Sequence, residues 1–335
     1  MPRITRQVTV VRDGMHNAFT DLQYWQGCYW VGYRKGAGHV SPDARAVVAV
    51  SADRTRFCEV AHLRVPGDNR DPKLLPIDDN RMAMYFPSWT RGVAARDLQQ
   101  YITFTTNGVD WQPPVPILDP KLWLWRIRRH AGRYVGLVQN LQGDWADGRM
   151  PHQLDLMVSD DLMTWTKVAR VGEAAGLNES DIFWHDDGEA WIVSRSVVKR
   201  EGSFFASARE PYVDWDVTEM TPMVHAPVFV HHEGELYVAG RCQPHTAGNP
   251  VFPWPGASVG LWRLTRGKLR PVLHIPAAGD CSYPGLLKDP EGRLCMTYYS
   301  QHAYVMGIER YPQDTAMPAD VYFAEVEVWS LSDDD

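Results

Sequence analysis

The chain has 335 residues, of which 44% are hydrophobic, 22% charged and 11% aromatic, enough apolar mass for a sizeable core. Its 34 basic and 41 acidic residues give a formal net charge of -7, which argues against a general nucleic-acid binder. The 5 cysteines form no C-x-x-C pair and no apolar run reaches the length of a membrane span, so a disulfide scaffold, a zinc site and a membrane protein are disfavoured.

A hairpin signature recurs about every 50 residues along the chain. Each copy is a tight turn followed by a short strand rich in β-branched and aromatic residues. In chain order the turns lie at 26–27, 79–80, 131–132, 187–188, 233–234 and 291–292. The strands that follow them are expected at 28–34, 81–86, 133–139, 189–195, 235–241 and 293–299.

A second strand pair follows the first in three consecutive units, joined at Asp53, Asn107 and Asp161. These turns resemble degenerate Asp-boxes, the turn motif of sialidase-like propeller blades. Six units with four strands each predict an all-β protein, a six-bladed β-propeller with four-stranded antiparallel blades. We expect a single domain over 1–335, whose last strand at 321–328 closes the ring, with 8–11 as its candidate partner.

Functional side chains recur at two fixed offsets from the turns. Seven residues after the second turn residue, three units carry an arginine: Arg34, Arg195 and Arg241. Nine residues before it, four units carry an ionisable residue: Asp71, Glu179, His225 and Tyr283. Antiparallel pairing brings the two offsets to the same blade end, so these side chains should share one mouth of the central channel. Clustered arginines bind carboxylates bidentately, so the expected ligand carries a carboxylate.

The segments around these positions resemble the sialidase (neuraminidase) superfamily over most of the chain. The resemblance lies in 178–195, in 240–241 and in 281–286. It implies that Tyr283 is the nucleophile and Glu179 its helper base. It further implies that Arg195 and Arg241 bind the carboxylate of the sugar.

Two parts of the sialidase pattern are replaced in this sequence. The segment 15–22 lacks the arginine that the family has there, and the loop of the family's acid/base Asp falls near His39. Arg34 or Arg70 could supply the missing guanidinium. We predict Asp71 rather than His39 as the acid, because Asp71 shares the offset of the two paired residues and should point into the channel. The other candidate sugar contacts are His225, Trp89, Trp125 and Trp254.

The sequence thus predicts a glycoside hydrolase that cleaves a terminal, sialic-acid-like sugar from an acidic glycan. A five-bladed fructosidase or arabinanase is an alternative, because 70–72 resembles its Arg-Asp-Pro motif and Asp21 would then be the nucleophile. Two further alternatives are a polysaccharide lyase acting on a uronate, with His39 or His225 as base, and a non-enzymatic binding module.

No nucleotide fingerprint or metal-ligand spacing is present, so we expect no cofactor and no metal. We likewise expect neither a nucleic acid nor a membrane as partner, and the oligomeric state stays open. The first residues contain no apolar stretch typical of a secretion signal. A cytoplasmic location is therefore the default expectation, or secretion if a leader precedes this sequence.

Overall fold

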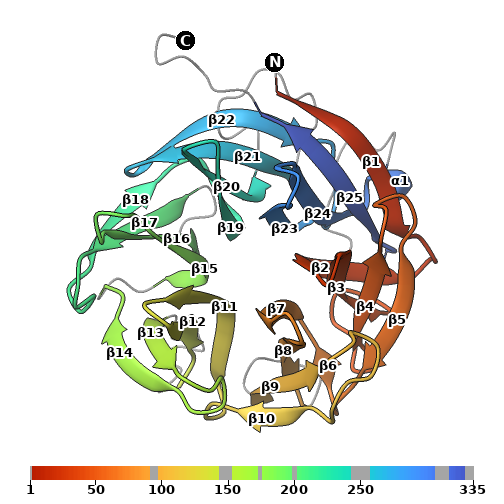
Figure 1. Cartoon of the computed structure of the whole chain (residues 1–335), viewed down its shortest axis with the longest axis horizontal. Helices are drawn as coiled ribbons and strands as arrows, with labels where there is room; N and C mark the ends of the chain where they lie inside the picture. The colour runs from red at the N-terminus through yellow and green to blue at the C-terminus, as the bar shows by residue number, and fades with distance from the viewer. Residues whose placement is uncertain are drawn as a thin grey trace.

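The computed structural model describes residues 2–90, 97–142, 153–172, 176–197, 202–242, 257–305 and 317–328. Their strands form six sheets arranged as a ring (Figure 1). The predicted six-bladed β-propeller with four-stranded antiparallel blades is confirmed. Within these residues, no helix is long and apolar enough to cross a membrane, and α1 (His302–Val305) is a single turn.

The first three blades are each built from strands that are consecutive in the chain. Blade one comprises β2 (His16–Trp25), β3 (Cys28–Gly36), β4 (Arg45–Ser51) and β5 (Cys58–Leu63). Blade two comprises β6 (Asp68–Asn69), β7 (Lys73–Asp78), β8 (Arg81–Trp89), β9 (Leu98–Thr105) and β10 (Val115–Ile117), with β6 and β7 both paired to β8. Blade three comprises β11 (Leu122–His130), β12 (Arg133–Asn140), β13 (Gln153–Ser159) and β14 (Thr166–Arg170).

Blades four and five repeat this arrangement, and blade six joins the two ends of the chain. Blade four comprises β15 (Leu177–Trp184), β16 (Ala190–Ser196), β17 (Ser203–Ala208) and β18 (Asp216–Met220). Blade five comprises β19 (His225–His232), β20 (Glu235–Cys242), β21 (Ser258–Thr265) and β22 (Lys268–Ile275). Blade six comprises β23 (Ser282–Lys288), β24 (Leu294–Ser300), β25 (Asp320–Glu327) and β1 (Arg3–Val11).

The ring is closed by pairing of the first strand with the last. β1 runs antiparallel to β25, from Arg3 opposite Glu327 to Val11 opposite Val321. The prediction that 321–328 closes the ring with 8–11 is therefore confirmed. In every blade the first strand of the unit lies nearest the axis and the last lies on the rim (Figure 1).

The turns between the first two strands of each blade follow from their residue types. Gly27, Gly132 and Gly234 have φ values of 77°, 80° and 82°, and the residue before each also has a positive φ. Two consecutive positive φ angles are typical of type I′ turns, whose twist matches a two-stranded hairpin. In blades one, three and five these turns fix the register of the hairpin, and so decide which residues meet at its far end.

At that far end the inner strands are irregular. Their pairing register shifts at a bulge in five of the blades, and in blade two the strand breaks into β6 and β7. Phe19, Asp71, Ala226 and Tyr283 lie at these irregularities with φ values of 59°, 43°, 50° and 45°. A bulge turns a side chain out of the regular alternation, so the irregularities change which side chains face the axis at this end.

Candidate functional site

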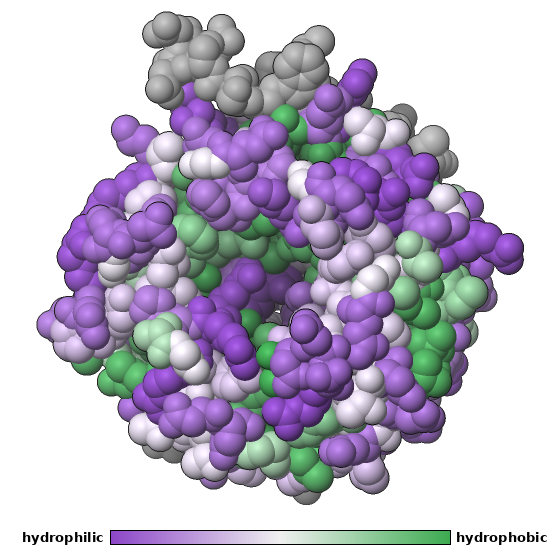
Figure 2. All heavy atoms as spheres, viewed as in Figure 1, coloured by the Kyte–Doolittle hydropathy of each residue, from purple (hydrophilic) through white to green (hydrophobic). Residues whose placement is uncertain are grey.

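A cavity of about 230 Å³ lies at the irregular end of the inner strands, and all six blades line it. Figure 2, seen along the same direction as Figure 1, shows a hydrophilic hollow at the centre of the ring. From blade one to blade six in turn, the lining residues are Phe19 and His39; Arg70 and Trp89; Trp123, Trp125, Gln139 and Leu141; Asn178, Glu179 and Arg195; Arg241; and Tyr283 and Tyr299.

The central contact of the cavity joins Tyr283 to Glu179. The Tyr283 hydroxyl donates to Glu179 Oε1 at 2.7 Å, and Arg195 Nη1 donates to the same oxygen at 2.8 Å. The second carboxylate oxygen, Glu179 Oε2, is buried and has no hydrogen-bond partner. The structure thus brings together three residues that the turn offsets placed at one mouth of the channel.

Electrostatics set the protonation states of this pair. Burial opposes ionisation of Glu179, but the charges of Arg195 and Arg241 and the Tyr283 hydrogen bond hold the pKa of Glu179 below its usual value. Burial and the charges of Asp71 and Glu179 raise the pKa of Tyr283 well above its usual value. At neutral pH the pair is therefore a phenol donating to a carboxylate, the arrangement in which the carboxylate can take the proton as the phenol oxygen attacks.

Arg70 reaches the cavity from the break between β6 and β7. Its guanidinium carbon lies 4.7 Å from the ring centroid of Phe19 and 4.3 Å from that of Trp89. Arg70 Nη1 donates to Asp68 Oδ2 at 2.8 Å, which fixes the orientation of the guanidinium plane. A stacked and hydrogen-bonded arginine is pre-organised to bind an anion.

Arg34, by contrast, does not line the cavity. Its side chain is fully buried, and Arg34 Nε donates to Asp68 Oδ1 at 2.8 Å. The expectation that Arg34 shares the mouth with Arg195 and Arg241 is corrected, and Arg70 takes that place. The cause is the buried Asp68 carboxylate, which accepts from both arginines and holds Arg34 behind Arg70.

Arg241 lines the cavity, and His225 supports it from behind. The two residues face each other across β19 and β20, with Arg241 Nη2 3.2 Å from His225 Nδ1. Burial and the charges of Arg241 and Arg195 hold the pKa of His225 far below its usual value, so the ring is neutral and accepts from Arg241. His225 does not line the cavity, so we interpret it as a residue that positions the Arg241 guanidinium and not as a direct sugar contact.

Asp71, the acid predicted from the turn offset, lies outside the cavity lining. Both of its carboxylate oxygens are buried without a hydrogen-bond partner. Burial raises the pKa of Asp71 to about 6, although Arg70 and Lys73 oppose the shift. Burial likewise lowers the pKa of Lys73 to about 8, and its Nζ lies 5.3 Å from the centroid of the Tyr283 ring. Asp71 is therefore a buried carboxyl group near Tyr283 that has no hydrogen-bond partner and does not face the ligand.

Indole rings from blades two and three form one wall. Trp125 stacks on Trp123 with centroids 4.6 Å apart, and Trp89 meets Trp123 edge-on at 6.1 Å. The indole N–H groups of all three are buried without a partner. Trp89 and Trp125 thus lie where they could stack on a sugar, as proposed from the sequence, while Trp254 lies outside the described residues.

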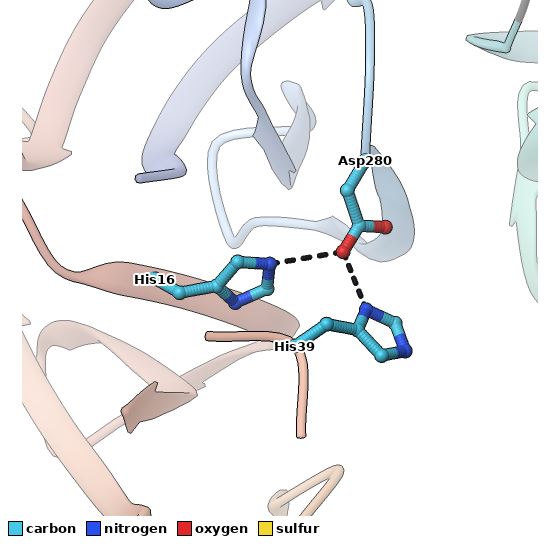
Figure 3. Close-up of side chains that lie close together, drawn as sticks. All are labelled: His16, His39 and Asp280. Carbon is cyan, nitrogen blue, oxygen red and sulfur yellow. Dashed lines mark hydrogen bonds and ion pairs between the residues drawn. The ribbon is translucent and has the colours of Figure 1, made fainter. Parts of the chain in front are cut away.

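His39 lines the cavity, and sequence reasoning missed the residues behind it. His39 Nδ1 lies 2.5 Å from Asp280 Oδ2, and His16 Nε2 lies 2.9 Å from the same oxygen (Figure 3). The donor atoms of these three residues lie within 4.8 Å of one another, close enough for metal ligands. Both rings point at the carboxylate oxygen itself, however, and Arg70 Nη2 is 3.3 Å from His39 Nε2. Because both ring nitrogens already hydrogen-bond to that oxygen, we interpret these three residues as a hydrogen-bonded cluster rather than a metal site.

No protein-family model matches the sequence, and no curated protein is similar to it. Among solved structures, a protein of unknown function from Dyadobacter fermentans DSM 18053 has a TM-score of 0.77 and 16% identity, over 98% of this chain and 99% of that one. A Trypanosoma rangeli sialidase mutant displaying trans-sialidase activity has a TM-score of 0.65 and 14% identity, over 94% of this chain and 55% of that one.

A GH43 β-xylosidase/α-arabinofuranosidase from a compost microbial metagenome has a TM-score of 0.54 and 11% identity, over 81% of this chain and 98% of that one. This chain spans only about half the length of the sialidase. At such identities the likeness concerns the fold. The propeller fold of this chain is similar to those of the sialidase and of the GH43 glycosidase.

Proposed function

We propose that the protein is a glycoside hydrolase that removes a terminal, carboxylate-bearing sugar of the sialic-acid type from an acidic glycan. The observation that carries the proposal is the hydrogen bond from Tyr283 to Glu179 inside a cavity that three arginines line. The fold that the chain shares with a sialidase and with a GH43 glycosidase supports this chemistry.

The charge of the cavity favours an anionic ligand. Among the residues that the structure describes, Arg70, Arg195 and Arg241 line it with three positive charges, and Glu179 is the one carboxylate in the lining. Each arginine donates to at least one protein group, Arg70 to Asp68, Arg195 to Glu179 and Arg241 to His225. A guanidinium has five N–H donors, so each of them keeps donors for a ligand carboxylate. Arginine presents a planar fork that matches a carboxylate, so a sugar acid is the expected ligand class.

A phenol nucleophile suits a sugar whose anomeric carbon already bears a carboxylate. A second carboxylate at that carbon would be repelled, whereas the Tyr283 oxygen is neutral until it transfers its proton to Glu179. In the proposed reaction Tyr283 Oη forms a bond to the anomeric carbon while the bond to the leaving oxygen breaks. Water then attacks the same carbon and releases the tyrosine.

His39 is the proposed acid for the first step and the base for the second. The sequence offset favoured Asp71, but His39 lines the cavity and Asp71 does not. In the first step His39 gives a proton to the leaving oxygen, and in the second it takes one from the attacking water. The two steps return Tyr283, Glu179 and His39 to their starting protonation states.

The alternative with Asp21 as nucleophile is weakened by the contacts of that residue. Asp21 Oδ1 accepts from Arg126 Nη1 at 2.9 Å and Asp21 Oδ2 accepts from the Leu74 backbone N–H at 2.9 Å. Asp21 does not line the cavity. A GH43-like arrangement would need this carboxylate free at the substrate.

The test is a screen of fluorogenic aryl glycosides, comparing sialic acid and other 2-keto-sugar acids with neutral sugars. We expect turnover of an acidic glycoside and none of the neutral ones. NMR of the first-released anomer should show retention, because the covalent route inverts the anomeric carbon twice. Each active substrate is also tested as its methyl ester, which should be far poorer because it removes the carboxylate that the arginines bind.

Two outcomes would overturn the proposal. Formation of an unsaturated, ultraviolet-absorbing product from a uronate-containing polysaccharide would identify a lyase instead. Binding of an acidic glycan without any turnover, measured by calorimetry, would identify a binding module.

A further inference from the structure

A buried carboxylate behind the cavity wall connects residues from blades one and six. Asp280 precedes β23, is fully buried, and meets His39 and His16 through Oδ2, as described above. Its other oxygen, Asp280 Oδ1, accepts from the Tyr299 hydroxyl at 2.8 Å. Asp280 thus joins the lining residue His39 to the buried His16 (Figure 3), and it also binds the lining residue Tyr299.

We propose that Asp280 is a positioning residue, which fixes the His39 ring so that Nε2 faces the cavity and can exchange a proton with the substrate. The inference rests on the proposed function, since it names the group that prepares the acid of that reaction. Asp280 itself does not line the cavity.

The hydrogen bonds decide which ring nitrogen of His39 carries the proton. Asp280 is ionised, because burial opposes ionisation less than the hydrogen bonds from His16 and His39 favour it, and its pKa lies well below the usual value. An ionised carboxylate only accepts, so His39 Nδ1 must donate to it. The proton-exchanging atom is then Nε2, which lies 3.3 Å from Arg70 Nη2 at the cavity.

The same contacts set how readily His39 takes up a second proton. Burial, Arg70 and His16 lower the pKa of His39, and the hydrogen bond and negative charge of Asp280 are the opposing influence. Of the charged or titratable groups, these have the largest influence on the ring. A ligand carboxylate bound to Arg70 would offset one of the lowering charges, so substrate binding itself should favour the protonated, acid form of His39.

The other possible role of this cluster, a metal site, fits the geometry less well. Ligands of one ion aim at a common point between them, about 2 Å from each atom. Here both ring nitrogens aim at one carboxylate oxygen, at 2.5 Å and 2.9 Å (Figure 3). The cluster is therefore read as a hydrogen-bonded relay, and metal binding becomes an outcome of the test.

The first test uses the intact protein without substrate. Two-dimensional ¹⁵N NMR of the histidine rings, with His39 assigned by comparison with His39→Gln, reports which nitrogen carries the proton. We expect protonation at Nδ1 and a bare Nε2 at pH 8. A proton on Nε2 would overturn the proposal, as would stoichiometric zinc sulfate shifting the His16 and His39 signals together.

The second test compares Asp280→Asn with Asp289→Asn, a matched control. Asp289 is also buried, also accepts from a tyrosine hydroxyl (Tyr29, at 2.6 Å), and does not line the cavity. On a natural glycan with a poor leaving group, Asp280→Asn should lose about 10²-fold in kcat, the range for a misplaced general acid. On an activated nitrophenyl glycoside the loss should be below about 5-fold, because that group departs without protonation.

The pH profile provides the readout that mere damage to the fold would not give. Removing the negative charge should move the basic limb of kcat to lower pH in Asp280→Asn and leave it in place in Asp289→Asn. Equal losses on both leaving groups, or an unmoved limb, would overturn the positioning role while leaving the proposed glycosidase intact. If no acidic glycoside is cleaved at all, the proposed function fails, and the ring tautomer still decides the inference.

Discussion

Two buried carboxylates on β15, only two residues apart, have opposite surroundings. Asp181 accepts from Arg128 Nε at 2.9 Å, from the Phe229 backbone N–H at 2.8 Å and from the Ile182 backbone N–H at 2.9 Å. Glu179 accepts through one oxygen, from Tyr283 and Arg195, and its other oxygen has no partner. The first carboxylate is satisfied by the protein, and the second is not.

The contrast extends to the two regions in which these residues lie. Around Asp181, the network of Asp21, Arg126 and Arg128 leaves no buried polar side-chain atom without a partner. Around Glu179, such atoms occur on Asp71, Arg70, Arg195 and the three indoles of the wall. Buried polar groups are normally hydrogen-bonded, so unpaired ones gathered at a cavity indicate where a ligand completes the set. We infer that the Asp181 region stabilises the fold of the ring and that the Glu179 region binds and cleaves the ligand.

The largest effect should follow from removing the hydroxyl of Tyr283. Tyr283→Phe removes the proposed nucleophile, so kcat should fall by about 10³-fold or more on every glycoside, regardless of leaving group. The matched control is Tyr298→Phe, whose hydroxyl is buried outside the cavity without a partner. If both variants lose activity equally, Tyr283 has no special role.

A substitution of Arg126 tests whether the network around Asp181 stabilises the fold. Arg126 donates to Asp21 and to the Pro227 and Pro284 carbonyl oxygens. Arg126→Met leaves the buried Asp21 carboxylate without its guanidinium partner, so the free energy of unfolding should fall by about 3–5 kcal/mol in denaturant titrations. A variant that keeps its stability but loses substrate affinity would assign Arg126 to the site instead.

Asp71 should make the protein less stable as the pH rises. Its pKa of about 6 in the folded state lies above the unfolded value of 3.8, so between about pH 4 and pH 6 the folded state binds the extra proton. Stability then decreases through that window, by about 3 kcal/mol for a shift of this size. Asp71→Asn should remove the decrease, and it should be more stable than the native chain at pH 7 but not at pH 4. A stability difference that does not vary with pH would contradict this account.

Arg241→Lys should have the smallest effect, and it should be confined to substrate. The lysine keeps the charge but loses the planar fork, so kcat/KM for an acidic glycoside should fall by about 10- to 100-fold. The thermal midpoint should stay within a few degrees of the native value. The measurement pairs steady-state kinetics with differential scanning calorimetry, and a loss of stability without a change in kcat/KM would reverse the assignment.

Much of the fold could be predicted because its signals are local. A turn such as Gln26-Gly27 and the strand after it lie within a few residues, so the hairpin and its repeat are visible in the sequence. The fixed offsets from the turns also placed Glu179, Arg195, Arg241 and Tyr283 near one another, since antiparallel pairing follows directly from the turn.

The site residues that the sequence misplaced or missed depend on contacts between segments that are distant in the chain. The offset could not separate Arg34 from Arg70, because the choice rests on the buried Asp68 between blades one and two. It could not place Asp71 behind the cavity, because the break between β6 and β7 turns that residue out of register. His16 and Asp280 were missed because they are 264 positions apart in the chain and meet only when blade six closes against blade one.

The most direct measurement of the central claim is covalent trapping. The protein is incubated with 2,3-difluorosialic acid, or with the corresponding difluoro derivative of whichever 2-keto-sugar acid it cleaves, then digested and analysed by mass spectrometry. We predict one glycosyl adduct, on the peptide that carries Tyr283, and none in Tyr283→Phe. An adduct on the peptide that carries Asp21 or Glu179, or turnover of an acidic glycoside with inversion and no adduct, would contradict the account.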